Sequence, residues 1–346
     1  MTGTDRTPAR RGVVTLTANP SVDRTLDLPG PLERGSVARL GVSHTEPGGK
    51  GVNVARAVAA AGVDVVSVLP AGENDPVVSA LHALGLRLVT VPIGSPVRTN
   101  YTLTEPDGTT TKLNEPGAPL DDEARRALQA AVHEHAVHAS WVVLSGSLPP
   151  GTPVDWYATL VRSLRDTGAR IAVDTSEAPL AALLAAGRDA VPDLLKPNTE
   201  ELAQLVSSTE HALSADPAAL LAAVDRLHGQ GVTEVLLTLG ADGALLSTAG
   251  GGRWSARPPR VTVRSTVGAG DSSLAGFVLA DLAGADPAGR LRTAVAYGSA
   301  SAALPGSAVP TPAEVDPAAV PVVPGFPGIT PSAPVGARPV AGPDAR

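Results

Sequence analysis

The segment Gly268-Ala269-Gly270-Asp271 combines small residues with one carboxylate. Leu274, Phe277 and Val278 follow at helical spacing, which predicts that the glycines open a helix. Glycine lets backbone N–H groups approach an anion closely, and the helix dipole adds positive potential. The pattern suits phosphoryl transfer, in which the amides stabilise the transferring phosphate and Asp271 accepts the proton of the attacking hydroxyl. On this motif alone, a glycine loop with Asp271 as an ordinary helix cap is an equal alternative.

A second glycine-rich segment, Gly48-Gly49-Lys50-Gly51-Val52-Asn53, also leads into a helix with an apolar face. It is not a Walker A loop, because Gly51 follows Lys50 where Ser or Thr is required. Three glycines around one lysine before a helix are nevertheless typical of a phosphate-binding loop. Taken alone, the segment favours a flexible loop with a solvated lysine.

A third polar segment, Lys196-Pro197-Asn198-Thr199-Glu200-Glu201, follows a short apolar run. Asn198 and Glu201 are three residues apart at an expected helix start, where both could face a hydrated Mg²⁺. A capping box, in which Asn198 caps the helix and Glu201 reaches back, explains the spacing equally well. The two interpretations do not exclude each other.

The elements that must position these segments alternate regularly through the middle of the chain. Continuous apolar runs, each ending in polar or turn residues, are separated by stretches with helical periodicity. This pattern predicts an α/β fold with a doubly wound, mainly parallel sheet and helices on both faces. Ligands bind such sheets beyond the carboxyl ends of the strands. The expected strands are 141–144, 171–173, 194–195 and 235–239, and the expected helices are 121–138, 155–167, 177–187 and 217–229.

Two earlier segments, 22–46 and 96–116, have a different pattern, because they are short, rich in Thr and Val, and alternating. The turn signal Glu105-Pro106-Asp107-Gly108 lies inside the second of them. We expect a small antiparallel β lid inserted into the α/β domain. An exposed sheet of this kind needs a cover for its face, either the active-site cleft or a second subunit.

The two ends of the chain carry little pattern. Residues 1–12 are expected to be a disordered leader, 13–323 the folded domain, and 324–346 a disordered tail rich in Pro, Ala and Gly. No apolar window is long enough to span a bilayer, and Val13–Ala18 is too short for a signal-peptide core. We therefore expect a cytoplasmic protein without a membrane partner.

Composition excludes several classes of function. The net charge of −7 over 346 residues argues against general nucleic-acid binding, which needs a basic stripe. An acidic protein that binds anions must concentrate positive potential at a few Lys, Arg and helix N-termini. The absence of cysteine excludes disulfide scaffolds, thiolate metal sites and cysteine nucleophiles.

The two glycine-rich segments, in this order, resemble the phosphofructokinase-B branch of the ribokinase-like sugar kinases. The resemblance extends from about Val13 to Val323, and the pair of signatures is specific although either alone is weak. It implies a ribokinase-like fold with a β lid, ATP as phosphoryl donor, Mg²⁺ as its counter-ion, and a homodimer formed through the lid.

Within that branch the chain is most similar to members that phosphorylate fructose 1-phosphate at its 6-hydroxyl, giving fructose 1,6-bisphosphate. The segments 19–23, 98–100, 112–117 and 145–149 carry this likeness. The resemblance implies that Lys50 and Arg98 hold the phosphate already on the sugar. It further implies sugar contacts from Asp23, Gly48, Gly49, Asn53 and Asn100; an ATP site at Lys196, Thr238, Gly240, Gly243 and Gly270; phosphoryl transfer by Gly268, Ala269, Gly270 and Asp271; and water-mediated Mg²⁺ contacts from Asn198 and Glu201.

Three alternatives remain open from the sequence. Two are kinases of the same branch that act on tagatose 6-phosphate or on fructose 6-phosphate. The third is a non-catalytic sugar-phosphate sensor that retains the fold. The intact segment 268–271 and the Asn198/Glu201 pair argue against a sensor, which needs neither a base nor a metal site.

Overall fold

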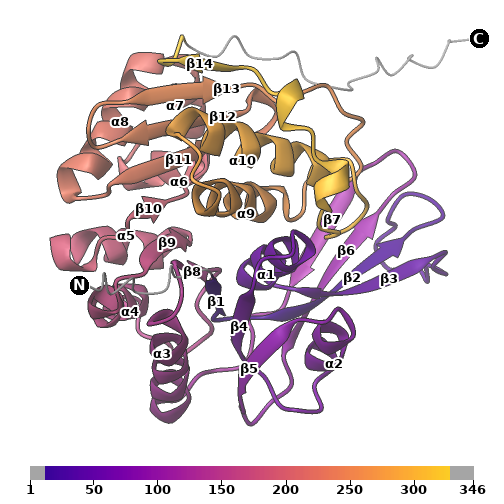
Figure 1. Ribbon diagram of the computed structural model, residues 1–346. Helices are drawn as coiled ribbons and strands as arrows, with labels where there is room; N and C mark the ends of the chain where they lie inside the picture. Colours follow the sequence, from indigo (N-terminus) through magenta and orange to yellow (C-terminus); the bar gives the residue numbers. More distant parts are fainter. Residues whose placement is uncertain (1–11, 328–346) are drawn as a thin grey trace, which may run out of the picture.

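A ten-stranded sheet and a four-stranded sheet organise residues 12–327, which the computed structural model describes (Figure 1). The strand order of the large sheet is β14-β13-β12-β11-β10-β9-β8-β1-β4-β5. Every neighbouring pair from β5 to β11 is parallel, and β11 to β14 pair antiparallel. The doubly wound, mainly parallel sheet is therefore confirmed. Its strands are β1 (Val13–Thr17), β4 (Val65–Pro70), β5 (Arg87–Val91), β8 (Trp141–Ser145), β9 (Arg170–Asp174), β10 (Leu194–Leu195), β11 (Glu234–Thr238), β12 (Ala244–Thr248), β13 (Arg253–Ala256) and β14 (Val322–Pro324).

Helices cover both faces of this sheet and divide the core into two clusters. One cluster packs α3 to α8 against the first face, and the other packs α1, α2, α9 and α10 against the second. Alternate residues of one strand enter different clusters, so Val142 joins the first and Val143 the second. Continuous apolar runs follow directly, because both faces are buried. The helices are α1 (Lys50–Ala60), α2 (Pro76–Ala83), α3 (Asp122–Ala136), α4 (Trp156–Leu164), α5 (Glu177–Ala185), α6 (Thr199–Leu205), α7 (Glu210–Ala215), α8 (Pro217–Gln230), α9 (Ala269–Leu282) and α10 (Pro287–Ala302).

The four-stranded sheet is the expected β lid, with strand order β3-β2-β6-β7. Its two outer pairs are antiparallel, whereas the central pair, β2 and β6, is parallel. The chain leaves β3 through α1, β4, α2 and β5 before it returns, so β6 enters the lid in the same direction as β2. The lid strands are β2 (Ser21–Asp27), β3 (Ser43–Gly48), β6 (Arg98–Thr104) and β7 (Thr110–Asn114).

Within the described residues, contacts with the domain extend slightly beyond the expected limits of 13 and 323. Gly12 is buried, and its carbonyl accepts hydrogen bonds from the start of β8. At the other end, Gly325 donates to β13 (2.8 Å) and Phe326 packs against the core. Residues 1–11 and 328–346, where disorder was predicted, lie outside the described residues.

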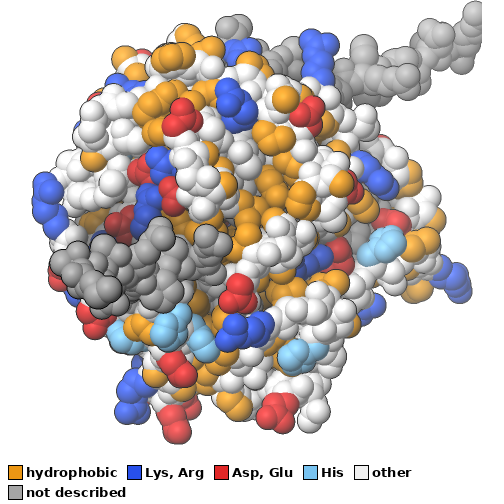
Figure 2. Space-filling view, viewed as in Figure 1, with side chains coloured by type: hydrophobic (Ala, Val, Ile, Leu, Met, Phe, Trp, Pro, Cys, Tyr) orange, Lys and Arg blue, Asp and Glu red, His pale blue; other side chains and the backbone are white. Residues whose placement is uncertain are grey.

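Acidic and basic side chains are interspersed over the face of the protein that Figure 2 shows. Within residues 12–327, no helix has the length and apolar character needed to cross a bilayer.

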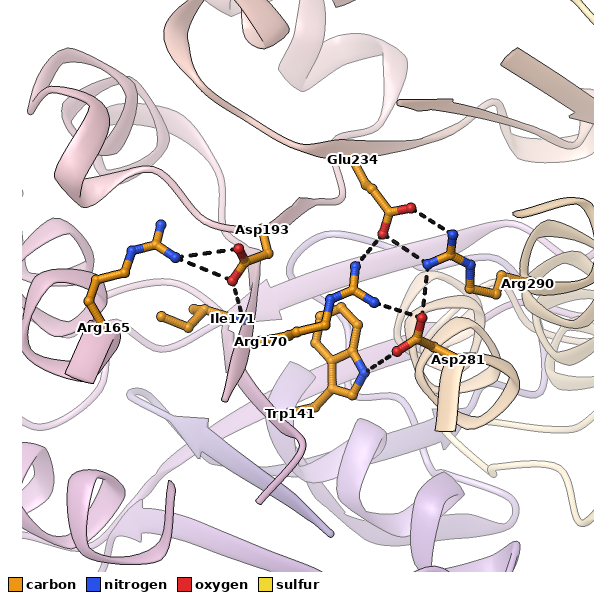
Figure 3. A network of polar contacts seen from close by, with 8 residues as sticks. All are labelled: Trp141, Arg165, Arg170, Ile171, Asp193, Glu234, Asp281 and Arg290. Carbon is orange, nitrogen blue, oxygen red and sulfur yellow. Dashed lines mark hydrogen bonds and ion pairs between the residues drawn. The ribbon is translucent and has the colours of Figure 1, made fainter. Parts of the chain in front are cut away.

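An ion-pair network ties the amino ends of the parallel strands to α9 and α10 (Figure 3). Arg170, at the start of β9, contacts Glu234 and Asp281, and Arg290 reaches the same two carboxylates at 2.9 and 2.8 Å. The indole N–H of Trp141 donates to Asp281 at 2.9 Å. Because Asp281 lies in the last turn of α9, the network fixes that helix to the sheet at the end far from its glycine-rich start.

Candidate active site

Charged side chains from four elements meet where the parallel strands end. Asp174 is the last residue of β9, and its carboxylate binds the Nζ atoms of Lys50 (2.8 Å) and Lys196 (3.0 Å). Lys50 begins α1, and Asn53, one turn later, donates to the carboxylate of Asp271 in the first turn of α9 (2.9 Å). The three predicted segments, far apart in the sequence, therefore form one cluster.

The amino ends of α1 and α9 lie at this cluster, and neither is capped by a side chain. Gly49 precedes α1 with φ 114°, and Gly268 precedes α9 with φ 77°. A side chain at Gly270 would reach within 3.3 Å of Lys196 Nζ, so glycine keeps the approach open. The interpretation of Asp271 as a helix cap is wrong, because Gly268 occupies the cap position. The Ala269 N–H donates to the Thr266 carbonyl at 3.4 Å, and neither helix start has a side-chain acceptor, which suits a site for an anion.

The environment of Asp271 adjusts its basicity. Burial, and after it the negative charge of Asp174, raises the pKa of Asp271 to about 6. Lys50, the hydrogen bond from Asn53 and Lys196 oppose that rise. A carboxylate of this pKa is ionised at neutral pH and still accepts a proton far better than an ordinary aspartate.

Asp174 was not among the residues predicted from the sequence. It is fully buried, yet Lys196 and Lys50 outweigh the effect of burial and hold its pKa below the ordinary value. Burial likewise disfavours the charged form of Lys50, but Asp174, Asp271 and Glu201 keep its pKa above the usual range. The signal for Asp174 was available, since it is the polar residue directly after a buried strand.

Asn198 and Glu201 form the capping box that the sequence allowed. Asn198 Oδ1 accepts from the Glu201 N–H (2.7 Å), and Glu201 Oε2 accepts from the Asn198 N–H (2.9 Å). Glu201 Oε1 remains directed toward Lys50, 3.9 Å from its Nζ, and burial raises the Glu201 pKa. No group of three acidic or histidine side chains within residues 12–327 could hold a metal. Glu201 Oε1, which the capping box does not use, suits a water-mediated contact to a hydrated Mg²⁺.

The lid contributes a separate polar group. Asp23 Oδ1 accepts hydrogen bonds from Ser21 (2.7 Å) and from the side-chain amide of Asn100 (3.0 Å). A side chain at Gly48 would overlap the Asp23 carboxylate in its present position, so glycine here lets that carboxylate stay in place. Asp23, Gly48 and Asn100, all predicted to bind sugar, therefore lie together on adjacent strands.

The two cations predicted to hold one phosphate have different partners in the structure. Arg98 donates to the carbonyl of Glu115 (3.1 Å), and its buried Nε has no hydrogen-bond partner in the described part of the chain. Lys50 instead contacts Asp174. Ser21 pairs with Gly48 on one side and Arg98 on the other, so Arg98 and Gly48, two residues before Lys50, lie on opposite sides of β2.

Three of the five residues predicted for ATP lie at the end of β11, and the other two, Lys196 and Gly270, lie in the charged cluster. Thr238 is the last residue of β11 and forms an isolated bridge with Asn198. The following turn contains Gly240 (φ 59°) and Gly243 (φ 102°), both in the left-handed region that favours glycine. A side chain at Gly243 would overlap the Ala256 carbonyl. This turn therefore opens at the same edge of the sheet as the charged cluster.

Comparisons with known proteins support the resemblance. The model of the pfkB family carbohydrate kinases matches residues 16–314. A 1-phosphofructokinase from Xanthomonas campestris is 37% identical over 270 residues, which cover 77% of this chain and 83% of the relative. The ATP-dependent 6-phosphofructokinase isozyme 2 of Escherichia coli is 33% identical over 292 residues, 84% of this chain and 92% of that one.

Solved structures agree with this assignment. The crystal structure of phosphofructokinase-2 from Escherichia coli in complex with substrates and products is 32% identical. It covers 87% of this chain and 96% of its own, with a TM-score of 0.80. The chain thus has the fold and the sequence signatures of a phosphotransferase that acts on carbohydrates, and it belongs to the pfkB family of carbohydrate kinases.

Proposed function

We propose that this protein transfers the γ-phosphoryl group of ATP to the 6-hydroxyl of fructose 1-phosphate, giving fructose 1,6-bisphosphate and ADP. The relative from Xanthomonas campestris, named 1-phosphofructokinase, supports this substrate. The observation that carries the chemistry is the Asp271 carboxylate, buried at the uncapped start of α9 and hydrogen-bonded to Asn53.

In this mechanism Asp271 accepts the proton of the 6-hydroxyl as its oxygen bonds to the γ-phosphorus and the bond to ADP breaks. The Gly268, Ala269 and Gly270 amides act as an anion hole for the charge on the transferring group. Lys196, 3.0 Å from Asp174, adds a fixed positive charge on the ATP side. Its buried ion pair keeps that charge in place without a mobile counter-ion.

The ATP phosphates would also carry Mg²⁺, and Asn198 and Glu201 are proposed to contact it through water. When bound, Mg²⁺ would supply positive charge to offset the negative charge of the phosphates. Thr238, Gly240 and Gly243 line the adjoining edge and are proposed to contact the rest of the nucleotide.

Asp23, Gly48, Gly49, Asn53 and Asn100 are proposed to bind the sugar hydroxyls. Arg98 is proposed to hold the phosphate already present, because its buried Nε lacks a partner within the described residues. Lys50 is proposed to assist it, because its ammonium has three N–H donors and one of them already binds Asp174. Lys50 thus has a second role open to it, next to the transferring group.

A homodimer through the lid completes the proposal. Apolar side chains are exposed on the lid and its connections, and a second copy would cover them. They are Leu32, Val37, Leu40, Val42 and Leu113. Sedimentation of Val37→Asp, whose wild-type side chain is 85% exposed, tests this, and an unchanged dimer would argue for another interface.

The decisive experiment measures ATP turnover with fructose 1-phosphate, tagatose 6-phosphate and fructose 6-phosphate, for the wild type and for Asp271→Asn. Loss of a positioned base costs about 10²–10⁴-fold in rate, so the variant should bind all substrates and turn over hardly at all. Preference for fructose 6-phosphate would instead follow the relative from Escherichia coli named 6-phosphofructokinase. Binding of sugar phosphate without any ATP turnover would identify a sensor.

A further inference from the structure

Arg56, on the second turn of α1, is buried among polar partners. Its side chain is only 9% exposed. One guanidinium nitrogen donates to the carbonyls of Pro47 (3.2 Å) and Ser307 (3.1 Å) and to Asn53 Oδ1 (3.3 Å). The second terminal nitrogen, Nη2, lies 3.5 Å from a Glu46 carboxylate oxygen. Arg56 is therefore held from three directions and points one donor at Asn53.

The contact with Asn53 decides which way its amide faces. A guanidinium only donates hydrogen bonds and a carboxylate only accepts them. With Oδ1 toward Arg56 and Nδ2 toward Asp271, both contacts are satisfied. A flipped amide would set N–H groups against the guanidinium and an oxygen against the carboxylate. Arg56 thus excludes the orientation in which Asn53 would repel Asp271.

We propose that Arg56 is a positioning residue for phosphoryl transfer: it fixes the Asn53 amide so that its N–H donates to the Asp271 carboxylate. The inference rests on the proposed function, in which Asp271 is the base. Nothing in the geometry requires Arg56 to touch a substrate.

The support behind Arg56 comes from distant parts of the chain. Glu46, in lid strand β3, accepts hydrogen bonds from the backbone N–H (2.9 Å) and the hydroxyl (3.1 Å) of Ser307, which follows α10. A side chain at Gly306 would crowd the same carboxylate at 2.5 Å. The lid, α1 and the segment after α10 thus meet at one guanidinium.

Two charged environments bear on any pH measurement. Glu46 and Asp23 are the acidic groups that act on Arg56. Asp174, Lys50 and Lys196 are the charged groups that act on Asp271, together with the Asn53 hydrogen bond, which favours its ionised form. Losing that hydrogen bond should therefore make Asp271 protonate at higher pH.

The test compares Arg56→Gln and Arg56→Lys with the wild type in two titrations. One is the pH profile of kcat/KM for fructose 1-phosphate. The other is a ¹³C NMR titration of the Asp271 carboxyl carbon, identified by its loss in Asp271→Asn. We expect the midpoint to move to higher pH by up to about one unit, the equivalent of one hydrogen bond to a charged group.

The NMR titration is needed because a substrate phosphate also ionises at about pH 6 and would contribute to the pH profile of kcat/KM. Arg56→Lys keeps the charge but loses the fork that reaches several partners, so its shift should be smaller than that of Arg56→Gln. Should Arg56→Gln fail to fold, Arg56→Lys alone decides the question. An unmoved midpoint in the folded variants would overturn the inference.

A double-mutant cycle tests whether Arg56 acts through Asn53. In an Asn53→Ala background, Arg56→Gln should produce no further shift of the Asp271 midpoint. An equal shift in both backgrounds would mean that Arg56 acts on Asp271 independently of the amide, and would refute the positioning role.

Arg290→Gln is the matched control, because Arg290 is equally buried, at 9% exposure, but belongs to the network at the opposite edge of the sheet. It should lower the melting temperature and leave the Asp271 midpoint unchanged. If Asp271→Asn turned over normally, the proposed base would be wrong whatever Arg56 does. If Asp271→Asn were inactive and the midpoint did not respond to Arg56, only the positioning role would fail.

Discussion

Replacing the proposed base should stabilise the protein while it abolishes turnover. Asp271 ionises near 3.8 in an unfolded chain and at about 6 in the folded one. Roughly two pKa units at about 1.4 kcal/mol each mean that the buried charge costs up to about 3 kcal/mol above pH 6. In Asp271→Asn the substituted amide would carry no charge, and its oxygen could still accept the hydrogen bond from Asn53.

The difference in unfolding free energy between Asp271→Asn and the wild type should depend on pH. Between about pH 4 and 6 the folded state holds the Asp271 proton more tightly than the unfolded state, so wild-type stability falls as pH rises through this window. Asp271→Asn lacks that loss. Its advantage should therefore be near zero at pH 4, grow through the window and stay constant above pH 6.

Urea unfolding of both proteins at pH 4, 5, 6 and 8 measures this difference, and all other titrating groups are common to the pair. An Asp271→Asn protein that is no more stable than the wild type at pH 8 would refute the reasoning. So would an advantage of the same size at every pH, because it would have to come from packing and not from charge.

Further predictions concern the lid, the two cations and the distant network. Gly48→Ala should displace the Asp23 carboxylate and raise KM for the sugar phosphate about tenfold or more, which steady-state kinetics would reveal. Arg98→Ala should raise the same KM with little change in kcat, whereas Lys50→Ala should also lower kcat, because Lys50 lies beside Asp174 and Asp271; identical effects of the two variants would contradict separate roles. Asp281→Asn should lower the free energy of unfolding by roughly 1–3 kcal/mol, since two arginines would lose a partly buried partner, and normal urea stability would count against that account.

Strands β8 to β11 and most helices between them were predictable because both faces of each strand are buried, whereas β1 and β4, equally buried, were not among the expected strands. That burial produces short continuous apolar runs such as Trp141–Leu144, and the turn residues after each run distinguish them from the longer apolar stretches of α5 and α8. The edge of the sheet was harder. β5 and β13 are partly exposed, and α10 is rich in Ala, Gly and Ser, so neither pattern separates these elements from loops.

For the site, the glycine-rich segments were evident because few structures need closely spaced glycines before a helix. The contact between Asn53 and Asp271 was beyond any local pattern, since 218 residues separate them. Arg56 had the appearance of an ordinary basic residue on a helix. Its burial depends on Glu46 and Ser307, and only the fold brings these together.

The same separation makes the active site a late product of folding. Hydrogen bonds across 218 and 251 residues, from Asn53 to Asp271 and from Arg56 to Ser307, form only when both ends of the domain have met. Closing loops of that length is entropically costly before the core repays it. A chain still being synthesised therefore has no assembled base until α9 and the segment after α10 have been made. Catalysis begins only with the completed domain.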